Sequence, residues 1–306
     1  MGGVLMRNGG LCSLAVRRPG GAIAVERRGW RSMAPKGLRS MRFVRGFPIL
    51  VETLANGVRA LNRSAEIAAG GDEKPMSGWQ VGLSMVLALC LAVLLFVAAP
   101  HAMALGMELM GLGGSMEGFT FHLWAGIFKL AIFVGYMACI SLIPDIRSVF
   151  EYHGAEHKTI HAFESNGPVT VERARACSRL HPRCGTTFML FVLAAAIMLH
   201  TVLVPALLLV WNPSSEMLRH AGVVLFKVLL IVPVSSLAYE LIRATAAMKP
   251  GVLGGMLRAP GLFLQRLTTR EPDDAQLEVA IESLRGALDS GSPYLDRFEP
   301  SGNSLE

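Results

Sequence analysis

The densest run of side chains that could carry out chemistry lies at residues 152–158, YHGAEHK. His153 and His157 are four positions apart, so on a helix both imidazoles project from one face. That spacing suits two nitrogen ligands on a single tetrahedral metal ion. Glu156 stands beside this face, and His-x-x-Glu-His is the pattern of inverted zinc metallopeptidases. The run therefore predicts a metal site of the zinc type, with Glu156 as the general base for hydrolysis.

An ordinary polar, solvated helix is the competing interpretation of this run. A pattern with three fixed positions in five residues arises easily in a chain that binds no metal. Gly154, inside the pattern, also weakens a helix by roughly 1 kcal/mol relative to alanine. The run alone does not separate the two interpretations.

A second group of ligand types, residues 181–185 (HPRCG), favours the metal site. His181 and Cys184 offer an imidazole and a thiolate, which with His153 and His157 make a His3Cys set. Cysteine combined with histidine favours zinc or another borderline metal over magnesium or calcium. The alternative is that Cys184 packs as a small apolar residue and His181 reaches the lipid headgroups.

Glu240 and Lys129 are the charged residues that stand out inside apolar stretches. A charged group in such a stretch is costly, and it usually faces a partner or an interior site. Glu240 could complete the metal ligand set, as a downstream glutamate does in inverted zincins. It could equally pair with Arg243 at the membrane interface or with Lys129.

The elements that must position these side chains are dominated by apolar helices. Hydrophobic residues make up 52% of the 306 residues and charged residues only 17%, against about a quarter charged in a typical soluble domain. The apolar residues gather in four stretches, each long enough for the roughly 17–25 residues that a membrane-spanning helix needs. The predicted spans are residues 78–100, 119–144, 186–211 and 221–242.

The distribution of Arg and Lys predicts the orientation of these spans. Thirteen lie in residues 1–77, none in 101–118, six in 145–185, one in 212–220 and seven after 242. Positive residues in short loops stay on the cytoplasmic side. Both termini and the 145–185 insert are therefore expected in the cytosol of a multi-pass protein of the cytoplasmic membrane. The net charge of +6 follows from this topology and requires no nucleic-acid partner.

The predicted fold is mainly α-helical, with three regions. Residues 1–77 form a cytosolic N-terminal region with a β-hairpin at about 11–28, around a Pro-Gly-Gly turn, and an amphipathic helix at about 47–68. Residues 78–242 form the four-helix transmembrane domain, with the His/Cys-bearing insert 145–185. The cytosolic tail, 243–306, carries an amphipathic helix at about 274–289.

Several segments together resemble the YqhQ-like family of bacterial multi-pass membrane proteins of unknown function. They are residues 3–7 (GVLMR), 152–158 (YHGAEHK), 178–185 (SRLHPRCG), 260–262 (PGL) and 267–274 (LTTREPDD). The family is described as predicted metal-dependent enzymes, so the resemblance implies a membrane-bound enzyme. In one departure, Gly2 stands where the family pattern has a glutamate. Either the natural start lies upstream or that carboxylate is dispensable.

Three functional hypotheses follow. The first is a zinc-type hydrolase at the cytosolic membrane edge, acting on peptide or lipid. In it, His153 and His157 bind the metal, and the ligand set is completed either by His181 and Cys184 or by Glu240. The second is a non-catalytic docking or assembly factor, in which a structural metal or polar cluster serves a membrane-protein partner or a second copy of the chain. The third, a transporter with Lys129 and Glu240 in a polar path, is less favoured because the four spans show no inverted repeat.

Overall fold

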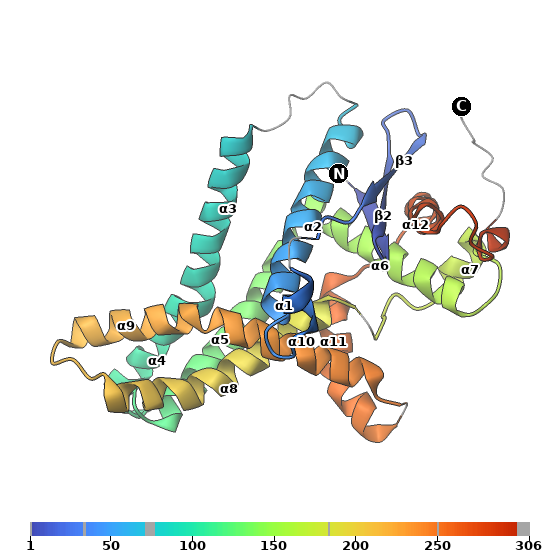
Figure 1. The fold of residues 1–306 in the computed structure, drawn as a ribbon. Coiled ribbons are helices and arrows are strands. Elements are labelled where there is room, and N and C mark those ends of the chain that lie inside the picture. Colours follow the sequence, from blue (N-terminus) through green and yellow to red (C-terminus); the bar gives the residue numbers. More distant parts are fainter. Residues whose placement is uncertain (1, 33–34, 71–76, 183, 250, 299–306) are drawn as a thin grey trace.

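The computed structural model describes residues 2–32, 35–70, 77–182, 184–249 and 251–298. It is mainly helical, with one small antiparallel sheet near the N-terminus, as predicted. Figure 1 shows two parts: a bundle of long helices, and a smaller body in which the sheet, α6 (Pro144–Glu164) and α12 (Asp274–Ala287) pack together. The candidate site lies where these two parts meet.

The sheet has three strands in the order β1-β2-β3: β1 (Gly3–Asn8), β2 (Leu11–Arg17) and β3 (Ile23–Gly29). The predicted hairpin is the β2-β3 pair, and β1 is an additional strand that the sequence analysis did not predict. Asn8 pairs with Leu11, which leaves a two-residue Gly-Gly connection, and Gly9 there has a φ of +57°. Short glycine turns of this kind match the twist of paired strands.

One face of the sheet packs on α12 and α6. Val4 and Met6 of β1 alternate with more exposed neighbours, so both side chains enter a core shared with Leu277, Ala280 and Ala155. The apolar stripe of α12 is therefore covered by the sheet. The helix itself starts with a capping box, in which the Asp273 carboxylate accepts a hydrogen bond from the backbone N–H of Gln276 at 2.7 Å.

Four helices in the described part of the chain are long and apolar enough to cross a membrane: Gly78–Leu109, Phe119–Ile140, Thr186–Val210 and Glu216–Thr245. The first comprises α3 (Gly78–Val93), a π-helical turn at Leu94–Ala98, and α4 (Ala99–Leu109). The second is α5 (Phe119–Ile140) and the third α8 (Thr186–Val210). The fourth comprises α9 (Glu216–Leu229) and α10 (Ile231–Ala247), which meet at Leu230.

The first and second of these helices end at other residues than the predicted spans do, and a proline explains each difference. The helix that begins at Gly78 continues beyond residue 100, because Pro100 falls in the first turn of α4, where a missing N–H is tolerated. The second span ends at Ile140 and not at residue 144. Pro144 opens α6 and holds Ile143 in an extended conformation, with ψ of 125°, because a residue before proline is driven out of the helical region.

The remaining helices connect the two parts. α2 (Gly46–Ala68) begins against α10, where a Cβ at Gly46 would meet the Ser236 backbone at 2.5 Å, and its last turn packs Ile67 on the sheet. α11 (Val252–Thr268) packs along α8. Short helices are α1 (Lys36–Ser40), α7 (Val171–Ala176) and a 3-10 turn at Leu295–Arg297.

Candidate metal centre

Three of the side chains selected from the sequence meet at one point. His153 and His157 project from α6, and Cys184 lies just before the start of α8. One ligand atom from each can be chosen so that all three lie within 4.8 Å of one another. The His153 Nε2 atom is 3.2 Å from the Cys184 sulfur. Tetrahedral zinc with ordinary bond lengths holds such ligand atoms roughly 3.3–3.6 Å apart, so the His153–Cys184 separation is close to the spacing that such a metal needs.

The outer nitrogen of each imidazole is held by a backbone carbonyl. His153 Nδ1 donates to Thr268 O at 2.8 Å, and His157 Nδ1 donates to Arg179 O at 2.6 Å. Because a carbonyl only accepts, each neutral ring carries its proton on Nδ1 and keeps the Nε2 lone pair free for a ligand bond. Metal-binding histidines are commonly oriented in this way.

The Cys184 sulfur lies at the first turn of α8. It contacts the Thr186 hydroxyl at 3.1 Å and accepts from the Thr186 backbone N–H at 3.4 Å. The Thr186 N–H and the N-terminal end of α8 therefore lie next to the sulfur. Cys184 is only 4% exposed, so a thiolate there requires a cationic partner close by.

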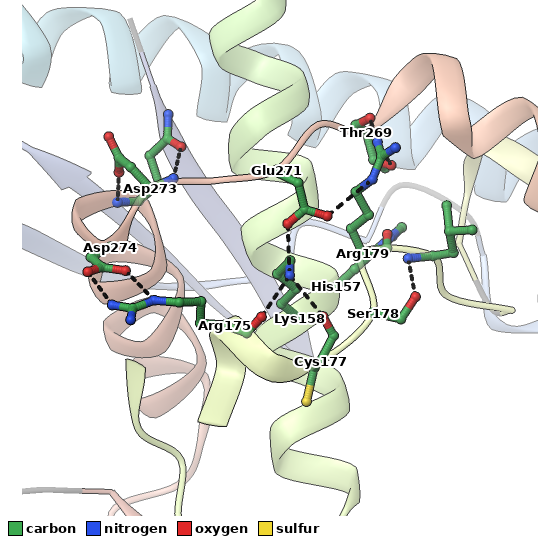
Figure 2. Close-up of polar contacts among 12 residues, drawn as sticks. His157, Lys158, Arg175, Cys177, Ser178, Arg179, Thr269, Glu271, Asp273 and Asp274 are labelled. Atoms are coloured by element: carbon green, nitrogen blue, oxygen red, sulfur yellow. Dashed lines mark hydrogen bonds and ion pairs between the residues drawn. The ribbon is translucent and has the colours of Figure 1, made fainter. Parts of the chain in front are cut away.

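The carbonyl that orients His157 belongs to a segment held by a buried lysine, as Figure 2 shows. Lys158 Nζ donates to the carbonyls of Arg175 and Cys177, at 3.0 and 2.9 Å, and pairs with Glu271 at 2.9 Å. Glu271 also contacts the Arg179 guanidinium at 3.4 Å, and the same guanidinium donates to the Thr269 carbonyl. Lys158 and Glu271 thereby tie the 175–179 segment to the chain that follows α11.

Gly154 allows that chain to approach α6. A Cβ at this position would lie 2.0 Å from the Arg270 carbonyl oxygen. The neighbouring amide of Arg270 donates to Phe150 O at 2.9 Å. Helix propensity alone predicts that Gly154 weakens α6. In the structure, its missing side chain brings the Thr268 carbonyl within reach of His153.

His181 lies beside the three ligands and not among them. Its ring centroid is 5.6 Å from that of His157 and 4.7 Å from that of His161. Burial, and then the neighbouring His161, lower the His181 pKa to about 4, although Glu164 at 3.6 Å opposes the shift. Gln265, fully buried on α11, pairs with both the N–H and the C=O of His181, at 2.8 and 2.9 Å.

The two carboxylates of the predicted site lie in different places. Glu156 is half-buried on α6, and burial raises its pKa while the nearby His153 opposes the rise. Glu240 is not brought to the three ligands. It forms a two-pronged ion pair with Arg45, at 2.7 and 2.8 Å, between α10 and the start of α2. Its partner is therefore Arg45, and neither Arg243 nor Lys129, as the sequence analysis had considered.

Several residues that support the site were not selected from the sequence. Gln265, Thr268 and Glu271 all belong to α11 or the segment after it, far from the histidines along the chain. Thr268 and Glu271 lie in the LTTREPDD segment that entered the family resemblance, whereas Gln265 lies just before it. Lys158 was inside the histidine run but was not assigned a role.

These features define a mainly helical protein with four candidate membrane spans and a compact His/Cys centre beside them. A family model described as "Protein of unknown function (DUF1385)" matches residues 41–290, and the chain belongs to this family. It is also 35% identical over 284 residues to the uncharacterized protein YqhQ of Bacillus subtilis (strain 168), over 88% of this chain and 83% of that protein. The predicted YqhQ-like resemblance is confirmed. No solved structure matches the chain.

Proposed function

We propose that this chain is a multi-pass membrane protein that binds a divalent transition metal, zinc by donor type, through His153, His157 and Cys184, and that it acts as a hydrolase. The observation that carries the proposal is the convergence of these three ligand atoms within 4.8 Å. Its support comes from the two carbonyls that hold the Nδ1 atoms and leave both Nε2 lone pairs available, with His153 Nε2 at 3.2 Å from the sulfur.

The charge pattern supports a cytosolic position for the centre. The loops 110–118 and 211–215, which join the spans at one end of the bundle, carry no Arg or Lys, whereas residues 145–185 carry six. The positive-inside rule then favours the cytoplasmic membrane of a bacterium, with both termini and the metal centre in the cytosol. A substrate reaching the centre would come from the cytosol or from the inner leaflet.

Three protein ligands favour catalysis over a structural role. Catalytic zinc sites keep one position open, whereas structural sites are closed by four protein ligands. A bound metal would supply Lewis-acid activation of water and of a substrate carbonyl or phosphoryl oxygen. The Glu156 carboxylate, next to His157 on α6, would accept the proton of the attacking water.

A closed structural site is the second candidate, because His181 is buried next to His157. Its exposed fraction is 5%, and the two ring centroids are 5.6 Å apart. A rotation of the His181 ring toward the centre would give four protein ligands. The centre would then act as a clamp between α6 and the start of α8, in a docking or assembly factor for a membrane protein or a second copy of the chain.

The first test is metal content. The protein is purified in detergent, and bound metal is quantified for wild type and for His157→Ala, Cys184→Ser and Glu156→Gln. We expect about one equivalent in wild type, loss in the first two variants and retention in Glu156→Gln. His161→Gln is the matched control, since His161 is on the same helix but donates to Leu180 O at 2.9 Å. Wild-type protein that binds no stoichiometric metal after reconstitution refutes the proposal.

The second test separates the open site from the closed one. Cobalt-substituted protein is titrated with a small metal-binding ligand such as a hydroxamate, and the visible spectrum is followed. An open position predicts a saturable spectral change, and His181→Gln should retain the metal. An unchanged spectrum, together with loss of metal in His181→Gln, would support the structural clamp and refute the hydrolase.

A further inference from the structure

A second cluster of unusual side chains lies inside the bundle, away from the metal centre. Six basic residues, contributed by all four candidate spans, gather between α4, α5, α8 and α9. Five of them are at most 8% exposed and His220 is half-buried. They are His101, His122, Lys129, His200, His220 and Lys227. Ionisable residues inside a span are costly and commonly mark a functional site.

One half of the cluster is a hydrogen-bonded chain with a defined direction. Lys227 Nζ is 3.0 Å from His101 Nδ1, and His101 Nε2 is 3.0 Å from His220 Nδ1. An ammonium group can only donate, so His101 accepts on Nδ1 and donates from Nε2. His220 likewise accepts on Nδ1 and presents its own Nε2–H. The hydrogen-bonded chain therefore starts at the Lys227 ammonium group and leaves the Nε2–H of His220 as its remaining donor.

The other half shows the same excess of donors. Lys129 Nζ is 3.3 Å from His200 Nδ1, which leaves the proton of His200 on Nε2. That Nε2 atom is buried and makes no hydrogen bond of ordinary geometry, although the Lys227 backbone lies near the ring. The same holds for both ring nitrogens of His122, which lies near the Met116 backbone. Buried polar groups without a partner are uncommon in folded proteins.

Five of these side chains, all except His220, line one small cavity that contains no carboxylate. Its lining comprises His101, His122, Lys129, His200 and Lys227, and otherwise Val97, Pro100, Ala125, Gly126 and Ile197. The lining has two ammonium groups and no carboxylate. The Phe121 ring, whose centroid is 5.8 Å from Lys227 Nζ, offers this ammonium group a cation–π contact in place of a negatively charged partner. What the cavity lacks is a negatively charged acceptor.

The size of the cavity narrows the choice of anion. The cavity is about large enough for one water molecule. A halide ion is close to that size, whereas a phosphate or sulfate ion, with four oxygens around its centre, would require the helices to separate. The cluster also extends from His220, in the second turn of α9, to Lys129, about halfway along α5. Along these helices, the cluster lies toward the end of the bundle opposite Cys184.

We propose that this cavity is a binding site for one chloride-sized anion within the membrane-spanning bundle, held by Lys129, Lys227 and the N–H groups of His122 and His200. The anion neutralises part of the buried positive charge and accepts from donors that otherwise have no partner. The site is separate from the metal centre and independent of the proposed hydrolase activity.

Chloride binding is tested on the full-length protein in detergent, purified in sodium gluconate. The midpoint of thermal unfolding is measured as gluconate is replaced by chloride at constant sodium, and radiolabelled chloride is bound to the same preparation. We expect a saturable rise of several degrees and about one chloride per chain, a similar response to bromide, and a much smaller one to sulfate or phosphate. Wild-type protein without saturable chloride binding overturns the proposal, as does an equal response to sulfate.

Substitutions in the cavity lining test whether the chloride-dependent rise in the unfolding midpoint comes from this site. Lys129→Met removes the charge but keeps an unbranched side chain, so in gluconate it should be at least as stable as wild type, and it should lose the chloride response. His200→Gln serves as a second variant should Lys129→Met not fold. Arg219→Met is the matched control, because Arg219 is a basic residue of α9 that faces Glu117 and Glu216, each at 3.9 Å. A chloride response that persists in Lys129→Met and His200→Gln places the site elsewhere and overturns the proposal.

Discussion

Gly154→Ala is the change that most directly tests how the metal centre is built. The new Cβ would lie 2.0 Å from the Arg270 carbonyl oxygen, so α6 and the segment after α11 must move apart by about 1 Å or more to restore ordinary contact. Two hydrogen bonds cross this contact. They are the Arg270 N–H to Phe150 O bond, at 2.9 Å, and the His153 to Thr268 O bond, at 2.8 Å.

The magnitude follows from opposing effects. Alanine favours a helix over glycine by up to about 1 kcal/mol. Overpacking against a backbone atom costs about 1–3 kcal/mol, and each weakened hydrogen bond costs a further 0.5–1.5 kcal/mol or so. We expect a net loss of about 1–3 kcal/mol in the free energy of unfolding. Because His153 loses its orienting carbonyl, bound metal should also fall.

The assay is thermal unfolding in detergent together with metal quantification. Gly57→Ala is the matched control, since Gly57 lies inside α2 and a Cβ there would meet nothing within 4 Å. It should be neutral or stabilising by up to about 1 kcal/mol and should leave bound metal unchanged. If Gly154→Ala is as stable and as rich in metal as Gly57→Ala, the close approach of Arg270 to α6 is refuted.

Two further predictions concern the supports of the fold. Lys158→Met should lower the free energy of unfolding by at least about 1–3 kcal/mol, because the Arg175 and Cys177 carbonyls lose a buried donor. It should also weaken metal retention. The control Lys249→Met, at an exposed position, should do neither. Comparable metal content and unfolding midpoints in these two variants would exclude the role given to Lys158. Glu240→Ala should destabilise the protein by leaving Arg45 unpaired. The double variant R45A/E240A should recover part of the lost stability, and metal content should be unchanged in both variants. Loss of metal would show that Glu240 is a ligand after all.

The local features of the chain were accessible from the sequence. Apolar stretches of membrane length depend only on consecutive residues, so four candidate spans could be predicted, with ends displaced where Pro100 and Pro144 have local effects. The shared face of His153 and His157 follows from helical periodicity. The first strand was missed although Gly9 and Gly10 follow it directly, because residues 3–8 are short and were read only for their family resemblance.

Tertiary contacts decided which predicted ligands could meet. His181 and Cys184 are three residues apart, yet Gln265 holds the backbone of His181 while Cys184 reaches the histidines. Glu240 was equally plausible from composition, and it pairs with Arg45, 195 positions away. No local pattern distinguishes these outcomes, since each depends on which helix packs against which.

The sequence by itself therefore determined four apolar stretches of membrane-spanning length, the helical spacing of two histidines and the presence of a cysteine and further histidines nearby in the chain. Only the tertiary structure decided that three of these side chains converge, that carbonyls of Thr268 and Arg179 orient the rings, and that Gly154 permits the approach. It also gathered lysines and histidines from separate spans around one cavity. The physical reason is the same in each case: periodicity and hydrophobic length act between neighbours in the chain, whereas ligand geometry and buried charge depend on residues that only folding brings together.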